Sequence, residues 1–230
     1  MNTMGLGNMT GLGKQSNFCK ICGVEFEPAE FGDIDRGYCY AETCVKAHAQ
    51  AKILKNLPKN LIKAGIPPKY WDFKPINGMD IQKMLKHKGA YFWGVSGAGK
   101  TALACIIGRE EILNAKDVKY VSSPKLIMEL QNTYRRDSDD SSYIILDRLS
   151  NQEVLILDDI GAEKMTDFVG QAFYFLINER EQWERKTIIT SNFSLAQLDK
   201  HIDSRVSSRI AGMCQIIELK GKDRRILTNE

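Results

Sequence analysis

Gly94-Val95-Ser96-Gly97-Ala98-Gly99-Lys100-Thr101 is the stretch that decides the fold of this chain of 230 residues. It has a glycine, four spacers and then Gly-Lys-Thr, which is the spacing of loops that bind phosphate. The apolar run 91–93 before it predicts a strand, and 102–113 after it, apolar at helical spacing, predicts a helix. Glycines allow a tight turn in which successive N–H groups and the helix N-terminus face one anion. We therefore predict an ATP site in which Lys100 neutralises the β- and γ-phosphates and the Thr101 hydroxyl coordinates Mg²⁺.

Two adjacent carboxylates follow a second apolar run farther along the chain. Residues 154–157 (VLIL) predict a buried parallel strand, and Asp158 and Asp159 stand at its carboxyl end. Ligands of open α/β sheets bind at that end. We expect Asp158 to hold Mg²⁺, directly or through water, and Asp159 to orient and deprotonate an attacking water. The alternative is a surface turn with two acids.

Further strands and helices alternate around these two motifs. Strands are predicted at 118–122, 186–192 and 216–219, and helices at 124–134, 143–149, 168–185 and 194–200. The fold class that we predict is α/β. Asn192 ends one strand, where it could sense the γ-phosphate and help to position water. A plain strand-ending turn is the alternative for Asn192.

Four of the six cysteines lie in two close pairs near the N-terminus, Cys19-x2-Cys22 and Cys39-x4-Cys44. Each pair can supply two thiolates to one tetrahedral Zn²⁺, which would hold together a segment too small to bury its own core. We prefer Cys44 to His48 as the fourth ligand. A redox dithiol at Cys19 and Cys22 is the competing interpretation.

The sequence around these motifs indicates two ordered parts joined by a linker. Residues 47–64 are rich in lysine and predict helices broken at Pro58. The paired prolines at 67–68 exclude a regular helix there. The aromatic residues at 70–73 lie where an adenine could rest, although core packing explains them equally well. We predict a disordered tail at 1–17, a zinc-binding domain at 18–50, a linker helix at 51–65 and an ATPase domain at 66–230.

Composition and charge exclude some classes of protein. The chain is 43% hydrophobic, with a net charge of +3. No apolar run approaches the roughly 18 residues of a membrane span, and the N-terminus has no signal pattern, so we expect a cytoplasmic protein without membrane contact. The mildly basic balance permits nucleic-acid binding without demonstrating it.

Several of these motifs occur together, and in the same order, in one family. GVSGAGKT, VLILDDIGAEK, TIITSN, SRVSSRI and GKDRR cover roughly residues 66–227, and they resemble the AAA+ ATPases of the DnaC/IstB type, the bacterial and phage helicase loaders. A zinc module before such a core is similar to loaders of the DnaI kind, where that domain grips the replicative helicase. The resemblance implies an AAA+ P-loop NTPase core, a parallel sheet flanked by helices.

The resemblance also implies roles for single residues. Lys100 and Thr101 match the Walker A pair, Asp158 and Asp159 the Walker B acids, and Asn192 the first sensor. Arg209 best matches the finger that reaches a neighbour's ATP, and Arg205 is the weaker match. Arg225 fits the second-sensor arginine. Solvated charges or ion pairs are the alternative interpretation of these arginines.

Two departures from the wider AAA+ pattern bear on mechanism. Asp159 stands where many AAA+ enzymes have Glu, so we expect slow turnover, suited to a switch. The sequence ends some twenty residues after Arg209, so we expect no separate helical lid. The nucleotide would then be partly open, and a neighbouring subunit would complete its binding site. Both features favour ATP-dependent assembly, with subunits stacking into a hexameric spiral.

The function implied by the resemblance is ATP-dependent loading of a hexameric replicative helicase onto single-stranded DNA. We expect DNA contacts from Lys125, Tyr134, Arg135 and Arg136 by phosphate pairing and base stacking, although a solvated face explains these residues equally well. An IstB-like transposition helper ATPase and a non-hydrolysing adaptor that blocks the helicase are the alternatives.

Overall fold

The computed structural model describes residues 17–26, 39, 41–74, 80–133 and 142–221. The chain divides into two compact units, residues 1–55 and 56–230. Arg225 and the residues 134–136, for which roles were predicted, lie outside the described residues, as does most of the predicted tail. Among the described residues, no helix combines the length and the apolarity that a membrane span requires.

The first unit is small and contains the four clustered cysteines. Two short strands, β1 (Asn17–Phe18) and β2 (Glu25–Phe26), pair antiparallel, and the helix α1 (Glu42–Lys55) follows. Cys44 is buried in the first turn of α1. Phe26, which is partly buried, packs on the cysteines. A core of this size does not stabilise a domain without a covalent or metal link.

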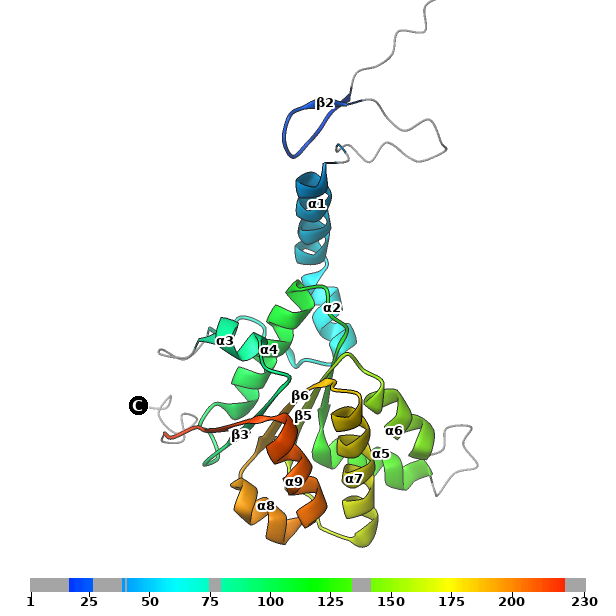
Figure 1. Ribbon diagram of the computed structural model, residues 1–230, viewed down its shortest axis with the longest axis vertical. Coiled ribbons are helices and arrows are strands. Elements are labelled where there is room, and N and C mark those ends of the chain that lie inside the picture. Colours follow the sequence, from blue (N-terminus) through cyan, green and yellow to red (C-terminus); the bar gives the residue numbers. More distant parts are fainter. Residues whose placement is uncertain (1–16, 27–38, 40, 75–79, 134–141, 222–230) are drawn as a thin grey trace, which may run out of the picture. The chain divides into compact units, whose positions relative to one another are not determined.

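The second unit is built on a five-stranded parallel sheet with the order β4-β5-β6-β3-β7. Figure 1 shows β3, β5 and β6 of this sheet with helices around them. Its strands are β3 (Gly89–Trp93), β4 (Val118–Ser122), β5 (Val154–Ile160), β6 (Lys186–Ser191) and β7 (Gln215–Glu218). The strand β3 lies between β6 and β7, and the next strand in sequence, β4, lies at the far edge. This order places the carboxyl ends of β5, β6 and β3 next to one another.

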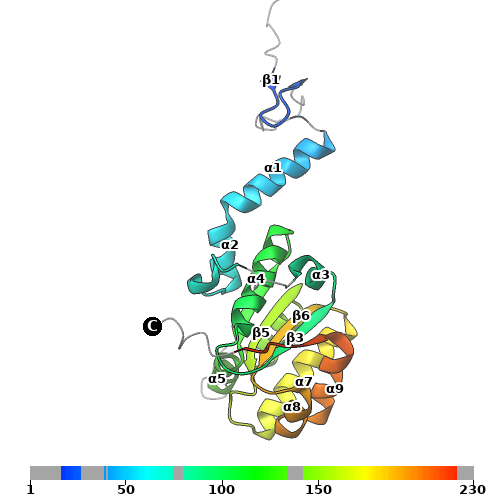
Figure 2. The ribbon, with the colours of Figure 1, turned by 90° about the vertical axis from the view of Figure 1, so that its left-hand side faces the viewer.

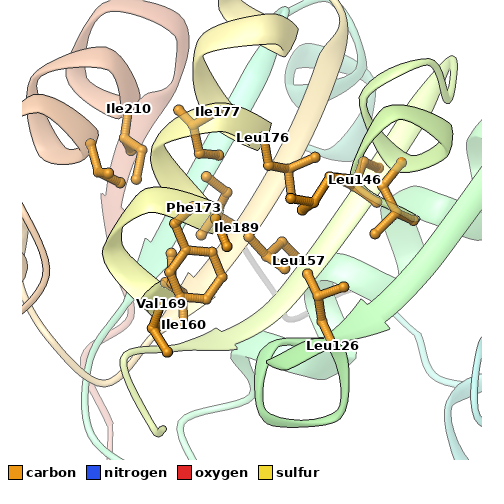
Figure 3. Close-up of a cluster of buried hydrophobic side chains, with 14 of the residues drawn as sticks. Leu126, Leu146, Leu157, Ile160, Val169, Phe173, Leu176, Ile177, Ile189 and Ile210 are labelled. Atoms are coloured by element: carbon orange, nitrogen blue, oxygen red, sulfur yellow. The ribbon is translucent and has the colours of Figure 1, made fainter. Parts of the chain in front are cut away.

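Both faces of the sheet are covered by helices, which is why its central strands are apolar on both sides (Figure 2). Alternate residues of a strand point to opposite faces. Tyr91 belongs to one core cluster and Phe92 to the other, and Leu155 and Ile156 divide in the same way. Figure 3 shows the first cluster, in which Phe173 of α7 packs among aliphatic side chains of the sheet and the surrounding helices. The α/β fold with a parallel sheet flanked by helices is therefore confirmed.

The helices divide between the two faces by the cluster that they join. The second cluster contains residues of α2 (Leu57–Ala64), α3 (Ile81–Leu85) and α4 (Lys100–Leu113). The first contains residues of α5 (Ser123–Thr133), α6 (Ser142–Ser150), α7 (Asp167–Gln182), α8 (Leu195–His201) and α9 (Ser204–Met213). A short 3-10 helix, η1 (Pro68–Tyr70), stands at the paired prolines, where no regular helix was expected.

Local chemistry explains where some of these elements begin and end. The lysine-rich segment forms α1 and α2, and Pro58 lies in the first turn of α2, where its missing N–H costs no hydrogen bond. Gly65 closes α2 with a φ of 81°, and Ser194 starts α8 with a capping box completed by Gln197. The strand β5 extends beyond the predicted 154–157 and includes Asp158 and Asp159.

Candidate functional site

The loop between β3 and α4 turns on three glycines with positive φ. These angles are 144° at Gly94, 75° at Gly97 and 98° at Gly99. A Cβ at Gly94 would lie 2.4 Å from the backbone oxygen of Leu219, so this position accepts only glycine. Gly99 is the N-cap of α4, and Lys100 is the first residue of the helix. The loop therefore ends at a helix N-terminus, whose free N–H groups favour an anion.

Lys100 joins this loop to the end of β6. Its ammonium donates hydrogen bonds to the carbonyl oxygens of Gly94 and Val95, both 2.8 Å away. A third bond, of 2.9 Å, goes to Oδ1 of Asn192. The side chain is buried, although it carries a full charge. A buried charge needs such partners, and here they hold the ammonium beside the glycine turn.

An irregularity in the pairing of β5 with β6 lies at the two acids. The register shifts between Leu157 and Ile160, and Asp159 has a φ of 63°, which is unusual for a residue with a side chain. A bulge of this kind redirects the side chains of the strand. Local strain of this kind often marks a functional site.

Asp158 is buried, and hydroxyl groups from both neighbouring strands donate to its carboxylate. The hydroxyl of Tyr120 on β4 donates to Oδ2 at 2.7 Å. The hydroxyl of Thr190 on β6 donates to Oδ1, also at 2.7 Å. Mg²⁺ prefers oxygen ligands. The Asp158 carboxylate supplies two oxygens, and the hydroxyl of Thr101 in the first turn of α4 supplies another. The residues present therefore fit a magnesium ion.

Asp159 is held through both its backbone and its side chain. Its N–H donates to Oγ1 of Thr190 at 2.8 Å. Its Oδ1 accepts a bond of 3.2 Å from Nδ2 of Asn192. Asn192 thus bonds to Lys100 through its oxygen and to Asp159 through its nitrogen. The structure brings Lys100, Asp159 and Asn192 into one hydrogen-bonded group, and Thr190 links Asp159 to Asp158.

Three polar residues around the acids were not singled out from the sequence: Tyr120, Thr190 and Glu163. Glu163 accepts from the Ser123 hydroxyl at 2.9 Å and from the Gly161 N–H at 3.1 Å. Burial raises the pKa of the Glu163 carboxyl, and the nearby charge of Asp159 acts in the same direction. The sequence signal was only that these residues stand on, or just after, predicted strands.

The four cysteines of the first unit come together, with their sulfur atoms all within 4.8 Å of one another. The Sγ atoms of Cys22 and Cys39 are 3.6 Å apart, and neither residue forms a disulfide. Four thiolates bound to one zinc ion at about 2.3 Å stand at comparable separations. The cluster includes Cys44, and among the described residues His48 is not part of it. The donor set therefore fits zinc and favours Cys44 over His48.

A tight turn in the chain positions the first cysteine pair. The N–H of Cys19 donates to the carbonyl of Val24 at 2.9 Å, and the N–H of Gly23 donates to the carbonyl of Cys19 at 2.8 Å. Gly23 has a φ of 71°, which a side chain would disfavour. This turn brings the sulfurs of Cys19 and Cys22 to the same side.

The second unit has matches among known proteins. A model of the family described as IstB-like ATP binding protein matches residues 84–230, which is more than half of the chain. The chain belongs to this family. It is an IstB-like AAA+ ATPase, related to the DnaC and DnaI helicase loaders, with a four-cysteine cluster near its N-terminus.

Two curated relatives of this IstB-like ATPase are replicative helicase loaders. DnaI of Bacillus subtilis (strain 168) is 29% identical, and the match covers 61% of this chain and 48% of DnaI. DnaC of Escherichia coli (strain K12) is 27% identical over 52% of this chain and 48% of DnaC. The chain thus spans about half the length of these relatives. A crystal structure of the DnaC helicase loader superposes with a TM-score of 0.57 at 25% identity, covering 67% of this chain and all of that one.

The two arginines of the IstB-like ATPase that were considered as fingers lie where α7 and α9 pack together. Arg209 donates to Asn178 Oδ1 at 2.9 Å and to the Tyr174 hydroxyl at 3.1 Å, and its Nε lies 3.4 Å from Glu181. Arg205 pairs with Asp203 at 2.7 Å. None of these partners is Lys100, Asp159 or Asn192.

The aromatic residues before β3 are packed in the second unit. Tyr70 and Trp71 pack on the second core cluster, and the Trp71 indole donates to the carbonyl of Ile66 at 2.9 Å. Phe73 is 47% exposed, and its ring meets that of Tyr70 edge-on at 5.6 Å. Core packing accounts for Tyr70 and Trp71, and Phe73 keeps an open surface.

Proposed function

We propose that this IstB-like ATPase loads a hexameric replicative DNA helicase onto single-stranded DNA, and that ATP binding and hydrolysis switch its assembly and release. The observation that carries the proposal is the hydrogen-bonded group of Lys100, Asn192 and Asp159 beside the glycine turn. Relatedness to DnaI and DnaC supports the choice of substrate. Such a loader acts in the cytoplasm.

Five polar side chains of the site have roles in the proposed hydrolysis. Lys100 and the N–H groups of residues 94–101 hold the β- and γ-phosphates of ATP. Thr101 and Asp158 would hold Mg²⁺, which would supply positive charge to the phosphates. Asp159 accepts a proton from the attacking water, and Asn192 orients that water. Because Asp159 has a shorter side chain than Glu, we expect slow turnover.

The finger in this proposal acts across a subunit boundary. Arg209 of one subunit reaches the ATP of its neighbour in a hexameric spiral and stabilises the charge that develops on the γ-phosphate. Its present partners on α7 are neutral apart from Glu181, so it can exchange them for a phosphate, which binds arginine strongly. Arg225, the proposed second sensor, would contact the γ-phosphate within its own subunit.

The small first unit is the proposed grip on the helicase. A zinc ion held by the four cysteines at 19, 22, 39 and 44 would fix its fold. Phe18, Val24 and Val45 are exposed around the cluster, which suits a protein partner. Single-stranded DNA would contact Lys125, exposed on α5, and the residues that follow this helix.

The experiment that tests this proposal combines binding with turnover. The purified protein is mixed with a candidate replicative helicase and, separately, with a transposase, and co-purification and zinc content are measured. ATP hydrolysis is measured with and without single-stranded DNA. A loader binds the helicase and hydrolyses ATP.

A second candidate, a transposition helper ATPase, is favoured by the description of the matching family as IstB-like. It predicts co-purification with the transposase and stimulation by duplex DNA. A non-hydrolysing helicase inhibitor would bind the helicase without turnover, although both acids are present.

A further inference from the structure

Asp158 is held from both sides of its own strand by hydroxyl groups. It stands near the end of β5, between β4 and β6 in the sheet. Tyr120 donates to Oδ2 from β4, and Thr190 donates to Oδ1 from β6, each at 2.7 Å. Each carboxylate oxygen has two lone pairs, so one lone pair of each oxygen stays available to an ion or its water.

The two hydroxyls differ in what else they support. Thr190 is buried, and its Oγ1 also accepts the N–H of Asp159, so it fixes the backbone of the bulge as well as Asp158. Within the described part of the chain, the Tyr120 hydroxyl bonds to Asp158 alone, and its ring packs against the second core cluster. The ring therefore keeps its place when the hydroxyl alone is removed.

We infer that Tyr120 is a positioning residue for the magnesium site, since its hydroxyl fixes the rotamer of Asp158. This inference rests on the proposed nucleotide site and adds to it a residue that the phosphate-loop and acidic motifs do not include. Without the hydroxyl, Asp158 keeps a bond on Oδ1 alone, and its carboxylate can rotate away from the ion. Outer groups that orient metal ligands commonly contribute tenfold or more to metal affinity.

The substitution Tyr120→Phe removes this hydroxyl and leaves the ring. The measurement is the affinity for a fluorescent ATP analogue, first in EDTA and then over a titration of Mg²⁺. We expect the affinity in EDTA to equal that of the wild type, since Lys100 and the loop are untouched. We expect the Mg²⁺ concentration at half-maximal effect to rise about tenfold. Binding is the readout, so no turnover is needed.

Tyr91→Phe is the matched control. The Tyr91 hydroxyl is also inside the sheet, but it donates to the backbone carbonyl of Phe193 at 2.8 Å. This variant should lose about as much thermal stability as Tyr120→Phe while its Mg²⁺ requirement stays at the wild-type value.

The possible results separate this inference from the function on which it rests. If the wild type binds ATP more tightly with Mg²⁺ and Tyr120→Phe has the same midpoint within twofold, the positioning role is wrong and the nucleotide site stands. If the control shifts as far as Tyr120→Phe, the effect is general to the sheet and the inference is again overturned. If the wild type does not bind ATP at any Mg²⁺ concentration, the proposed function itself fails.

Discussion

Nδ2 of Asn192 lies 3.2 Å from Oδ1 of Asp159 and donates a hydrogen bond to it across the ends of two parallel strands. The oxygen of the same amide accepts from Lys100 at 2.9 Å. One side chain therefore connects the residue proposed to hold phosphate with the residue proposed to take a proton. Because the glycine turn and Lys100 do not depend on this amide for their place in the loop, a mutation at Asn192 should separate nucleotide binding from hydrolysis.

We predict that Asn192→Ala lowers the rate of ATP hydrolysis by about 10²- to 10³-fold, as does the loss of one aligned donor in other active sites. The affinity for ATP should change only a few-fold, because the glycine turn and Lys100 remain. Single-turnover hydrolysis and analogue binding on the same sample measure the two effects. Hydrolysis at the wild-type rate would contradict the role given to Asn192.

The role of Arg209 is tested by mixing subunits. Arg209→Ala should bind ATP normally and lose hydrolysis by about 10³-fold or more, as expected for a finger that acts in trans. Asp159→Asn should also be inactive. Since each variant keeps the part that the other lacks, a mixture of the two should regain part of the activity at their shared interfaces. A mixture as inactive as its components would count against a finger in trans, and an active assembly of Arg209→Ala alone would exclude it.

The cysteine cluster predicts one zinc ion per chain, measured by metal analysis of the purified protein. Cys44→Ser should lose zinc and the proposed binding of helicase, because a structural site with three thiolates holds the metal weakly. His48→Ala is the control and should retain both. Zinc loss in His48→Ala together with zinc retention in Cys44→Ser would reverse the assignment of the fourth ligand.

We predict that the loss of Arg180 has a large effect on the stability of the fold. It is fully buried and donates to Thr187 Oγ1 and to the carbonyls of Leu149, Ser150, Gln152 and Lys186. Arg180→Ala removes the donor of all these acceptors, and among them the Ser150 carbonyl keeps a bond of 2.8 Å from Arg185. We therefore expect a loss of about 3–5 kcal/mol in the free energy of unfolding by urea. Arg148→Ala, at a side chain 57% exposed, should stay within about 0.5 kcal/mol. Equal urea midpoints for the two variants would contradict this account.

The start of α9 predicts a dependence on pH. The hydrogen bonds from the Arg205 side chain and backbone lower the pKa of Asp203. The stability from this carboxylate is therefore present above the unfolded pKa of about 3.9 and is lost as the pH falls through the lower folded value. Asp203→Asn keeps a capping side chain but no charge. The difference in unfolding free energy between wild type and Asp203→Asn, a few tenths to about 1 kcal/mol at pH 7, should shrink as the pH falls below the unfolded pKa and vanish below the folded one. A difference that stays constant would exclude the charge as its cause.

The sequence predicted the parts of the site better than their surroundings. The loop from Gly94 and the strand before the two aspartates have strong patterns, because a tight turn requires glycine and a buried strand requires apolar residues. The meeting of Asn192 with Asp159 depends on β6 lying between β5 and β3, and strand order is not written in local periodicity. The Tyr120 contact depends on the same order, so no motif indicated it. The predicted strand at 154–157 stopped short because the bulge places Asp158 and Asp159 inside β5.

The measurement that tests the proposed function most directly is the transfer of a purified ring-shaped replicative helicase onto closed circular single-stranded DNA, followed by isolation of the DNA. We predict that the helicase is recovered on the circle only when both this protein and ATP are present, and that Lys100→Ala abolishes recovery. Recovery that is equal without the protein or with Lys100→Ala would contradict the loader function.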